Sequence, residues 1–175
     1  TVQNDSTTTS MNNGSWHMCH CTQQGATRAD MYINGSLEDS DTSVSAIGAS
    51  TATVGIAARN NATQNWMAAK LDEIRILKVV LGAERITTEH NNQDANNTFY
   101  SAFGSPETFS NSNLSGYDYR VKITPQAAKV TANLTDFPLY VDLSDLPAGF
   151  FTNVKTDGAD IRVTLADGIT ELARE

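Results

Sequence analysis

The order of hydrophobic and polar positions predicts short strands separated by turns in the first part of the chain. Residues 16–22 (WHMCHCT) and 28–34 (RADMYIN) each indicate a strand. The dipeptide Asn34-Gly35 follows the second of these and favours a type I′ turn, because both central residues of that turn need a positive φ. The segment 28–39 is therefore expected to be a β-hairpin.

Residues 51–58 predict a further strand, and residues 66–80 (WMAAKLDEIRILKVV) show the strongest alternation in the chain. From Asp72 onward, successive side chains are expected on opposite faces of that strand. Glu73 and Arg75 would then share a face and could form an ion pair. The one good helix candidate is residues 82–92, which ends in asparagines suited to a C-cap.

The pattern changes in the second half of the chain. Residues 97–116 mix aromatic and turn-forming residues and predict a connector, and new strands are expected at 117–124, 137–143 and 160–168. Little helix and many short strands between turns are typical of β-sandwiches. The predicted domain limits are 1–105 for a first β domain, 106–116 for a connector and 117–175 for a second β domain.

Several motifs of the first domain occur in an order that resembles a known family. They are Trp16-His17, MYING at 31–35, VGIAARNN at 54–61, LDEIRI at 71–76, and TEHNNQ with TFY up to residue 100. In this order they resemble the C-terminal part of a laminin-G-like, concanavalin-A-like jelly roll. His90 stands where that family usually has tyrosine. The resemblance implies a lectin-like β-sandwich.

The second domain is similar to the N-terminal part of a domain of unknown function that accompanies laminin-G-like domains in bacterial surface and phage proteins. The similarity rests on YRVKIT, NLTDFPLYVDLSDL and TDGADIRVTLADGITEL. The expected fold class is thus all-β, with an incomplete laminin-G-like β-sandwich followed by a second partial β-sandwich. We expect either a longer polypeptide or strands added by a neighbouring chain to complete the sheets.

The stretch WHMCHCT contains histidine, cysteine and methionine side chains, so it must be tested as a metal site. On a strand, His17, Cys19 and Cys21 share one face and span roughly 13 Å, which is too far for one zinc ion with bonds of about 2.0–2.3 Å. The resemblance places small apolar residues at the two cysteine positions. Cys19 and Cys21 are therefore expected to pack in the core as small hydrophobic residues, and no metal ligand is assigned.

Asp72 and Glu73 are the acidic residues to weigh for glycan cleavage. Retaining glycosidases need two carboxyl groups about 5–5.5 Å apart, and neighbours on a strand point to opposite faces. The pair therefore does not fit, no catalytic residue is assigned, and an enzyme is disfavoured.

Ligand-binding candidates come from the loop that follows the 51–58 strand. Related lectin-like domains bind sugar or calcium through such loops with amides and carboxylates, so Asn60, Asn61 and Gln64 of this loop are candidates, together with Asp72 of the strand expected at 66–80. Calcium is weakly supported, since it needs six or more oxygen ligands and this loop has no cluster of carboxylates. Asp157, Asp160 and Asp167 are expected to shape turns, and no cofactor is expected.

The net charge of the chain limits the classes of partner that it can bind. The 175 residues carry a formal net charge of -8, which disfavours nucleic acid and anionic membrane surfaces, and no apolar run approaches the roughly 20 residues of a membrane span. We expect an extracellular, cell-surface or virion location. The favoured function is a non-enzymatic module that binds glycans or a surface receptor. The alternative is an architectural or assembly domain that contacts other chains or copies of itself.

Overall fold

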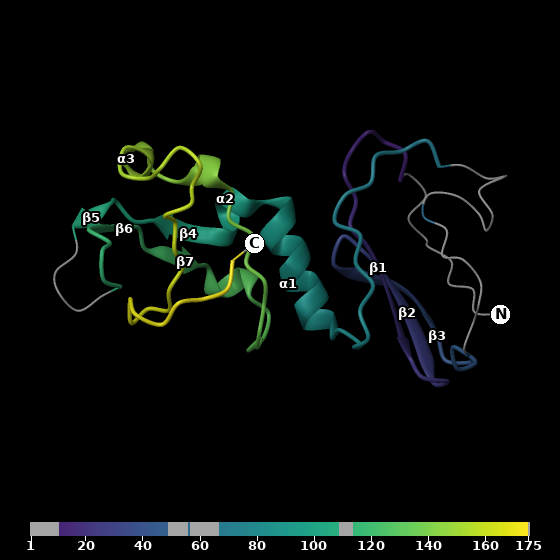
Figure 1. Cartoon of the computed structure of the whole chain (residues 1–175). Helices are drawn as coiled ribbons and strands as arrows, with labels where there is room; N and C mark the ends of the chain where they lie inside the picture. The colour runs from purple at the N-terminus through teal and green to yellow at the C-terminus, as the bar shows by residue number, and fades with distance from the viewer. Residues whose placement is uncertain (1–10, 49–55, 57–66, 109–113, 175) are drawn as a thin grey trace. The chain divides into compact units, whose positions relative to one another are not determined.

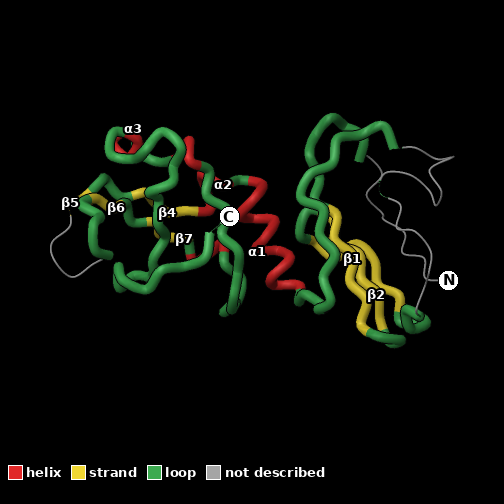
Figure 2. The backbone as a smooth tube through the Cα atoms, viewed as in Figure 1, coloured by secondary structure: helices red, strands yellow, loops and turns green. Residues whose placement is uncertain are grey.

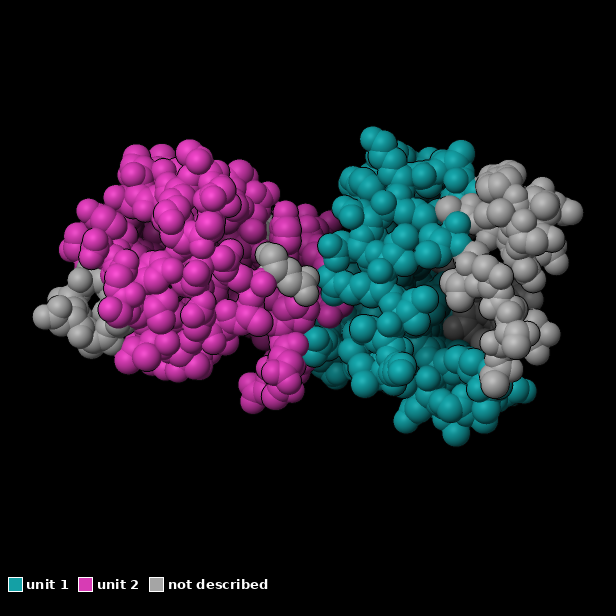
Figure 3. All heavy atoms as spheres, in the orientation of Figure 1, with its two compact units in different colours: residues 1–86 teal, residues 87–175 magenta. Residues whose placement is uncertain are grey.

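The computed structural model describes residues 11–48, 56, 67–108 and 114–174. The chain divides into two compact units, residues 1–86 and 87–175, which Figure 3 shows in different colours. This division comes earlier than the connector expected at 106–116. The domain limits 1–105, 106–116 and 117–175 stay a prediction.

The first unit contains one antiparallel sheet of three strands among its described residues. These are β1 (Cys19–Gln24), β2 (Arg28–Ile33) and β3 (Ser36–Asp41), paired in the order β1-β2-β3 (Figure 1). Asn34 and Gly35 have φ angles of 50° and 76°. The predicted hairpin with its type I′ turn is therefore confirmed, and β1 begins at Cys19 rather than at Trp16.

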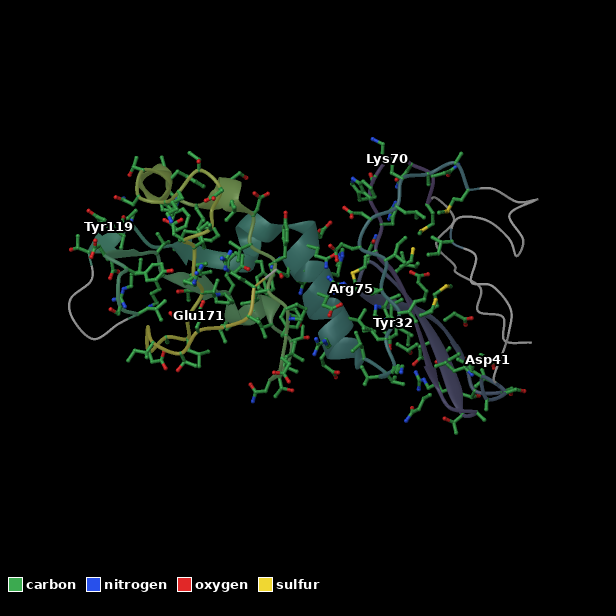
Figure 4. All side chains as sticks on the ribbon, viewed as in Figure 1. Tyr32, Asp41, Lys70, Arg75, Tyr119 and Glu171 are labelled. Carbon is green, nitrogen blue, oxygen red and sulfur yellow. The ribbon has the colours of Figure 1, made fainter. Side chains whose placement is uncertain are left out.

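The register of this sheet decides which side chains face the core. β1 and β2 pair without interruption, with His20 opposite Tyr32 and Cys21 opposite Met31. Tyr32, labelled in Figure 4, is buried with Leu81 and Ile86. Leu81 and Ile86 therefore pack on the face of β2 that carries Tyr32, while Ala29 and Ile33, which are also buried, lie on the opposite face with the cysteines of β1.

The strand predicted at 66–80 is wrong for the part that the structure describes. Residues 67–80 have no strand pairing, all are exposed, and Ile76 is 78% exposed. Glu73 has a φ of 52°, in the left-handed region, so the period-two alternation stops there. A strand is stable only with a hydrogen-bonded neighbour, and none pairs with this segment among the described residues. The strand predicted at 51–58 lies outside the described residues except for Ile56.

The helix predicted at 82–92 is confirmed as α1 (Ala83–Asp94). Gly82 O accepts hydrogen bonds from Arg85 N and Ile86 N, each at 3.1 Å, which closes the first turn. The asparagines expected to cap its end, Asn91 and Asn92, lie inside the helix instead. Their amides bind backbone groups of a distant segment.

The second unit is built from short elements joined by long loops, drawn green in Figure 2. Its strands form two sheets of two strands each, β4-β7 and β5-β6, among the described residues. The predicted connector is more ordered than expected, and the strand predicted at 117–124 is present in two pieces. The elements are α2 (Asn96–Phe99), β4 (Tyr100–Phe103), β5 (Glu107–Thr108), β6 (Tyr119–Arg120), β7 (Ile123–Pro125), η2 (Ala127–Lys129), η3 (Leu143–Asp145) and α3 (Ala148–Phe151).

The strands predicted at 137–143 and 160–168 are wrong. Residues 160–168 form only an isolated bridge, between Thr164 and Glu171. In 137–143 no strand pairing occurs, and the backbone of Tyr140 is bound by side chains, including the Tyr100 hydroxyl, which donates to Tyr140 O at 2.5 Å. The Asn92 amide donates from Nδ2 to Tyr140 O at 2.9 Å and accepts at Oδ1 from Tyr140 N at 2.6 Å. A side-chain amide thus replaces the backbone of a neighbouring strand.

Strands predominate over helices in the described residues, and this fits a β-sandwich protein. α1 is the only described helix longer than four residues. None of the helices in the described part of the chain has the length and apolar run needed to cross a bilayer. The second partial β-sandwich stays a prediction.

Candidate functional site

His17, just before β1, is hydrogen-bonded to two asparagine side chains, Asn13 and Asn34. His17 Nε2 lies 3.0 Å from Asn13 Oδ1, and His17 Nδ1 lies 3.1 Å from Asn34 Nδ2. Asn34 Oδ1 accepts from Met18 N at 3.1 Å, and Asn13 Oδ1 accepts from Ser15 N at 2.9 Å. Because a backbone N–H can only donate, these two bonds identify the oxygen atoms of the Asn34 and Asn13 amides. His17 Nδ1 must therefore accept and Nε2 must donate, so the imidazole is bound as its neutral Nε2–H tautomer.

The two cysteines do not pack in the core, so that prediction is wrong. Both Cys19 and Cys21 are free and exposed. The reason lies in the sheet: among the described residues β1 pairs only with β2 and is an edge strand, whereas the buried residues of the cysteine face, Ala29 and Ile33, are on the central strand β2. No second sheet covers this face within the described part of the first unit.

The surroundings raise the pKa of both thiols. For Cys19 the causes are partial burial and then the charge of Cys21, and for Cys21 the cause is partial burial. These thiols are therefore less ionised at neutral pH than an ordinary cysteine, and weaker nucleophiles. The described residues contain no group of three or more His, Cys, Asp or Glu side chains arranged to hold a metal ion.

The acidic residues at 72 and 73 each have a local partner. Asp72 Oδ1 accepts from Glu73 N at 2.9 Å, and Glu73 Oε2 pairs with Arg75 Nη2 at 2.6 Å, as predicted for Glu73 and Arg75. Arg75 is labelled in Figure 4. Because the segment is not a strand, the expected separation onto opposite faces does not apply. Each acid instead has its own hydrogen-bond partner.

The other three candidate ligand-binding residues, Asn60, Asn61 and Gln64, lie outside the described residues. Asp72 is described and exposed. The proposed grouping of these four side chains therefore stays a prediction.

The turn roles of the three aspartates near the C-terminus are confirmed. Asp157 Oδ1 accepts from Ala159 N at 3.1 Å, and Asp160 Oδ1 accepts from Lys155 N at 3.0 Å. Asp167 accepts from Ile169 N and Thr170 N at 2.9 Å and from Thr170 Oγ1 at 2.5 Å. The Thr170 hydroxyl first, and then the two backbone donors, lower the pKa of Asp167.

Sequence reasoning missed a polar group in the first sheet. Asp30 is buried on β2, Arg28 Nε donates to both its oxygens at 2.7 and 2.8 Å, and Ser40 of β3 donates to Oδ1. The hydrogen bond and charge of Asp30 raise the pKa of Arg28. The spacing of Arg28 and Asp30, two apart on a strand, was the available signal, since it places both on one face. The group ties β2 to β3 and has a structural role.

A family model of laminin G type, described as the concanavalin A-like lectin/glucanases superfamily, matches residues 1–87. This agrees with the resemblance found in the first domain. The comparisons give no support to the second family expected for 117–175. No curated protein and no solved structure matches the chain significantly.

Proposed function

We propose that this chain is a non-enzymatic binding module of a larger extracellular, cell-surface or virion protein, and that it contacts glycans or a surface receptor. The observation that supports this most is the match of residues 1–87 to a superfamily of lectins and glucanases. That match alone does not separate binding from cleavage, since fold does not fix function. The choice between binding and cleavage depends on the acidic side chains.

The environment of Asp72 and Glu73 favours binding over catalysis. Glycosidic cleavage needs one carboxyl group as acid and a second as nucleophile or base, both directed at the same bond. Here Asp72 accepts from the adjacent backbone amide and Glu73 is paired with Arg75. Both carboxylates thus have partners within their own segment, which supports binding over cleavage.

The binding residues proposed are Asn60, Asn61, Gln64 and Asp72. Amide groups donate and accept hydrogen bonds and carboxylates accept them, so these side chains suit sugar hydroxyls without a metal. No cofactor is proposed.

A glycan array with the full chain tests this function. We expect retention of at least one glycan class, and a combined Asn60→Ala, Asn61→Ala, Gln64→Ala variant should lose it while keeping its circular dichroism spectrum. The matched control is Asn153→Ala, an exposed asparagine of the second unit, which should bind normally. Retention by the triple variant would refute the site, and no retention by a folded wild-type chain would refute glycan binding.

An assembly domain is the second candidate, favoured by the exposed apolar side chains of residues 67–80. Leu71, Ile74, Ile76, Leu77, Val79 and Val80 are all at least 45% exposed. Exposed apolar patches mark interaction sites, and an unpaired extended segment can add to the sheet edge of another chain.

Sedimentation velocity distinguishes this candidate. If the segment joins copies of the chain, the wild type should be oligomeric at micromolar concentration and Ile76→Lys should be monomeric. Ile47→Lys is the matched control, because Ile47 is 79% exposed and Ile76 is 78% exposed. A monomeric wild type, or equal effects of the two substitutions, would contradict assembly through this segment.

A further inference from the structure

The exposed face of β1 presents two thiols that the proposed function does not use. Cys19 and Cys21 are two residues apart on a strand whose register with β2 is unbroken, so their side chains lie on the same face. Both are exposed and free. The pair is therefore accessible to a ligand from solvent.

The spacing of the pair favours a bridging ion over a disulfide. Same-face neighbours on a strand stand about 6.5–7 Å apart, whereas a disulfide brings the Cβ atoms to about 3.5–4.5 Å. A two-coordinate ion with metal–sulfur bonds of about 2.3 Å separates its sulfur atoms by only about 4.6 Å. Two cysteine side chains that lean toward each other along the strand can reach that distance.

A third sulfur donor lies across the strand pair. Cys21 is opposite Met31 of β2. Asn34 N donates to Met18 O at 2.9 Å, which makes Met18 and Asn34 a hydrogen-bonded pair; by alternation Cys21 and Met31 are a non-hydrogen-bonded pair. Side chains of such pairs are the closer kind, with Cβ atoms about 4.5–5.5 Å apart. The Met31 thioether can therefore approach an ion held by Cys21.

The donor set selects the class of ion. Thiolate and thioether sulfur are soft ligands that favour Cu(I), while zinc sites need four ligands and calcium needs oxygen. The register also places Asp39 and Asp41 of β3 on this face, opposite Met31 and Ala29.

We propose that Cys19 and Cys21, with Met31 as a third donor, bind one Cu(I) ion on the exposed face of β1. In the binding step Cu(I) forms bonds to the two cysteine sulfur atoms and to the Met31 thioether, and the two thiols release two protons. No electron is transferred. Because binding releases the two thiol protons, affinity should increase as pH rises.

The test is titration of the reduced full chain with Cu(I) under anaerobic conditions, in competition with a Cu(I) chelator of known affinity. We expect one Cu(I) per chain and ultraviolet sulfur-to-copper absorption. Outer-shell partners alone typically contribute 10–100-fold to metal affinity, so loss of a ligand in Cys19→Ser or Cys21→Ser should cost at least about 100-fold. Met31→Leu should weaken binding by roughly tenfold.

His20→Gln is the matched control, since His20 lies between the cysteines but faces the Tyr32 side of the sheet. It should bind Cu(I) as tightly as the wild type, with an unchanged urea unfolding midpoint in every variant compared. Undiminished binding by the Cys19→Ser, Cys21→Ser double variant would overturn the proposal. So would an equal loss in His20→Gln, or a wild-type chain that binds no Cu(I).

Discussion

At the scale of single residues, Asn34 has two functions in the hairpin. Its backbone adopts the positive φ that the type I′ turn needs, and its amide joins Met18 N to the imidazole of His17. Asparagine is among the few residues other than glycine that suit both, because it tolerates the left-handed region and carries a donor and an acceptor. The turn was predictable from Asn34-Gly35, but the bond to His17 was not, since it depends on the pairing register.

The hydrogen bonds of His17 predict its tautomer. Two-dimensional ¹H–¹⁵N spectra that detect ring couplings, recorded where His17 is neutral, should show the proton on Nε2. In Asn34→Gly, which keeps the turn but removes the amide, the ring should show a mixture of tautomers. A proton on Nδ1 in the wild-type chain would contradict the network.

Asp167 predicts a pH-dependent contribution to stability. Its folded-state pKa is lowered, chiefly by the Thr170 hydroxyl, below an unfolded value of about 3.9. Its contribution is therefore complete above about pH 5 and is lost as the pH falls below about 4, through the folded-state pKa. Urea unfolding should show Asp167→Ala less stable than the wild type at pH 7, with the difference shrinking toward pH 3.

Thr170→Val is the control for that experiment. It removes only the hydroxyl donor, so at pH 7 it should lose part of the stability that Asp167→Ala loses. Its difference in stability from the wild type should likewise shrink toward pH 3. A difference between Asp167→Ala and the wild type that is independent of pH would contradict the role of the ionised carboxylate.

At the scale of elements, polar side chains of α1 bind residues between 129 and 140 of the second unit. Thr88 Oγ1 lies 3.1 Å from Thr131 Oγ1, Asn91 donates to Lys129 O at 3.0 Å, and Asn92 pairs with both backbone groups of Tyr140. Asn92 is 1% exposed. A buried side-chain amide must be hydrogen-bonded, and here the backbone of Tyr140 supplies a donor and an acceptor for it.

Substitution of Asn92 tests this role. Asn92→Ala removes two hydrogen bonds of a buried amide, although Tyr140 O keeps the Tyr100 hydroxyl as a donor, and should lower the free energy of unfolding by about 2–3 kcal/mol. Asn91→Ala removes one half-buried hydrogen bond and should cost only about 1 kcal/mol. Urea denaturation followed by tyrosine fluorescence measures both. Equal effects of the two substitutions would contradict the account of Asn92.

Elements specified by residues close in sequence were predictable, whereas elements that depend on contacts distant in sequence were not. The hairpin and α1 were predictable because local chemistry specifies them. The strand at 137–143 was not, because alternation cannot reveal that its partner is Asn92, a side chain on a helix. The segment 67–80 has strand-like alternation but no pairing in the described residues, and the cysteines were misplaced because burial depends on what covers the sheet.

At the scale of the whole molecule, two units share one chain and only the first has a family match. Sequence resemblance predicted that family from Trp16-His17, the Asn34 hairpin and the motif at 71–76. The sequence could not place the candidate ligand residues, because a loop's geometry depends on the sheets that hold it. The central claim is that the first domain binds glycans without cleaving them.

The most direct test incubates the chain with the glycan that it retains on the array and follows both retention and the release of new reducing ends. If the domain binds without cleaving, glycan retention should be saturable, and new reducing ends should form no faster than in a buffer control at every pH from 4 to 9. Reducing ends produced by the wild type and abolished by Asp72→Asn or Glu73→Gln would contradict it and identify an enzyme.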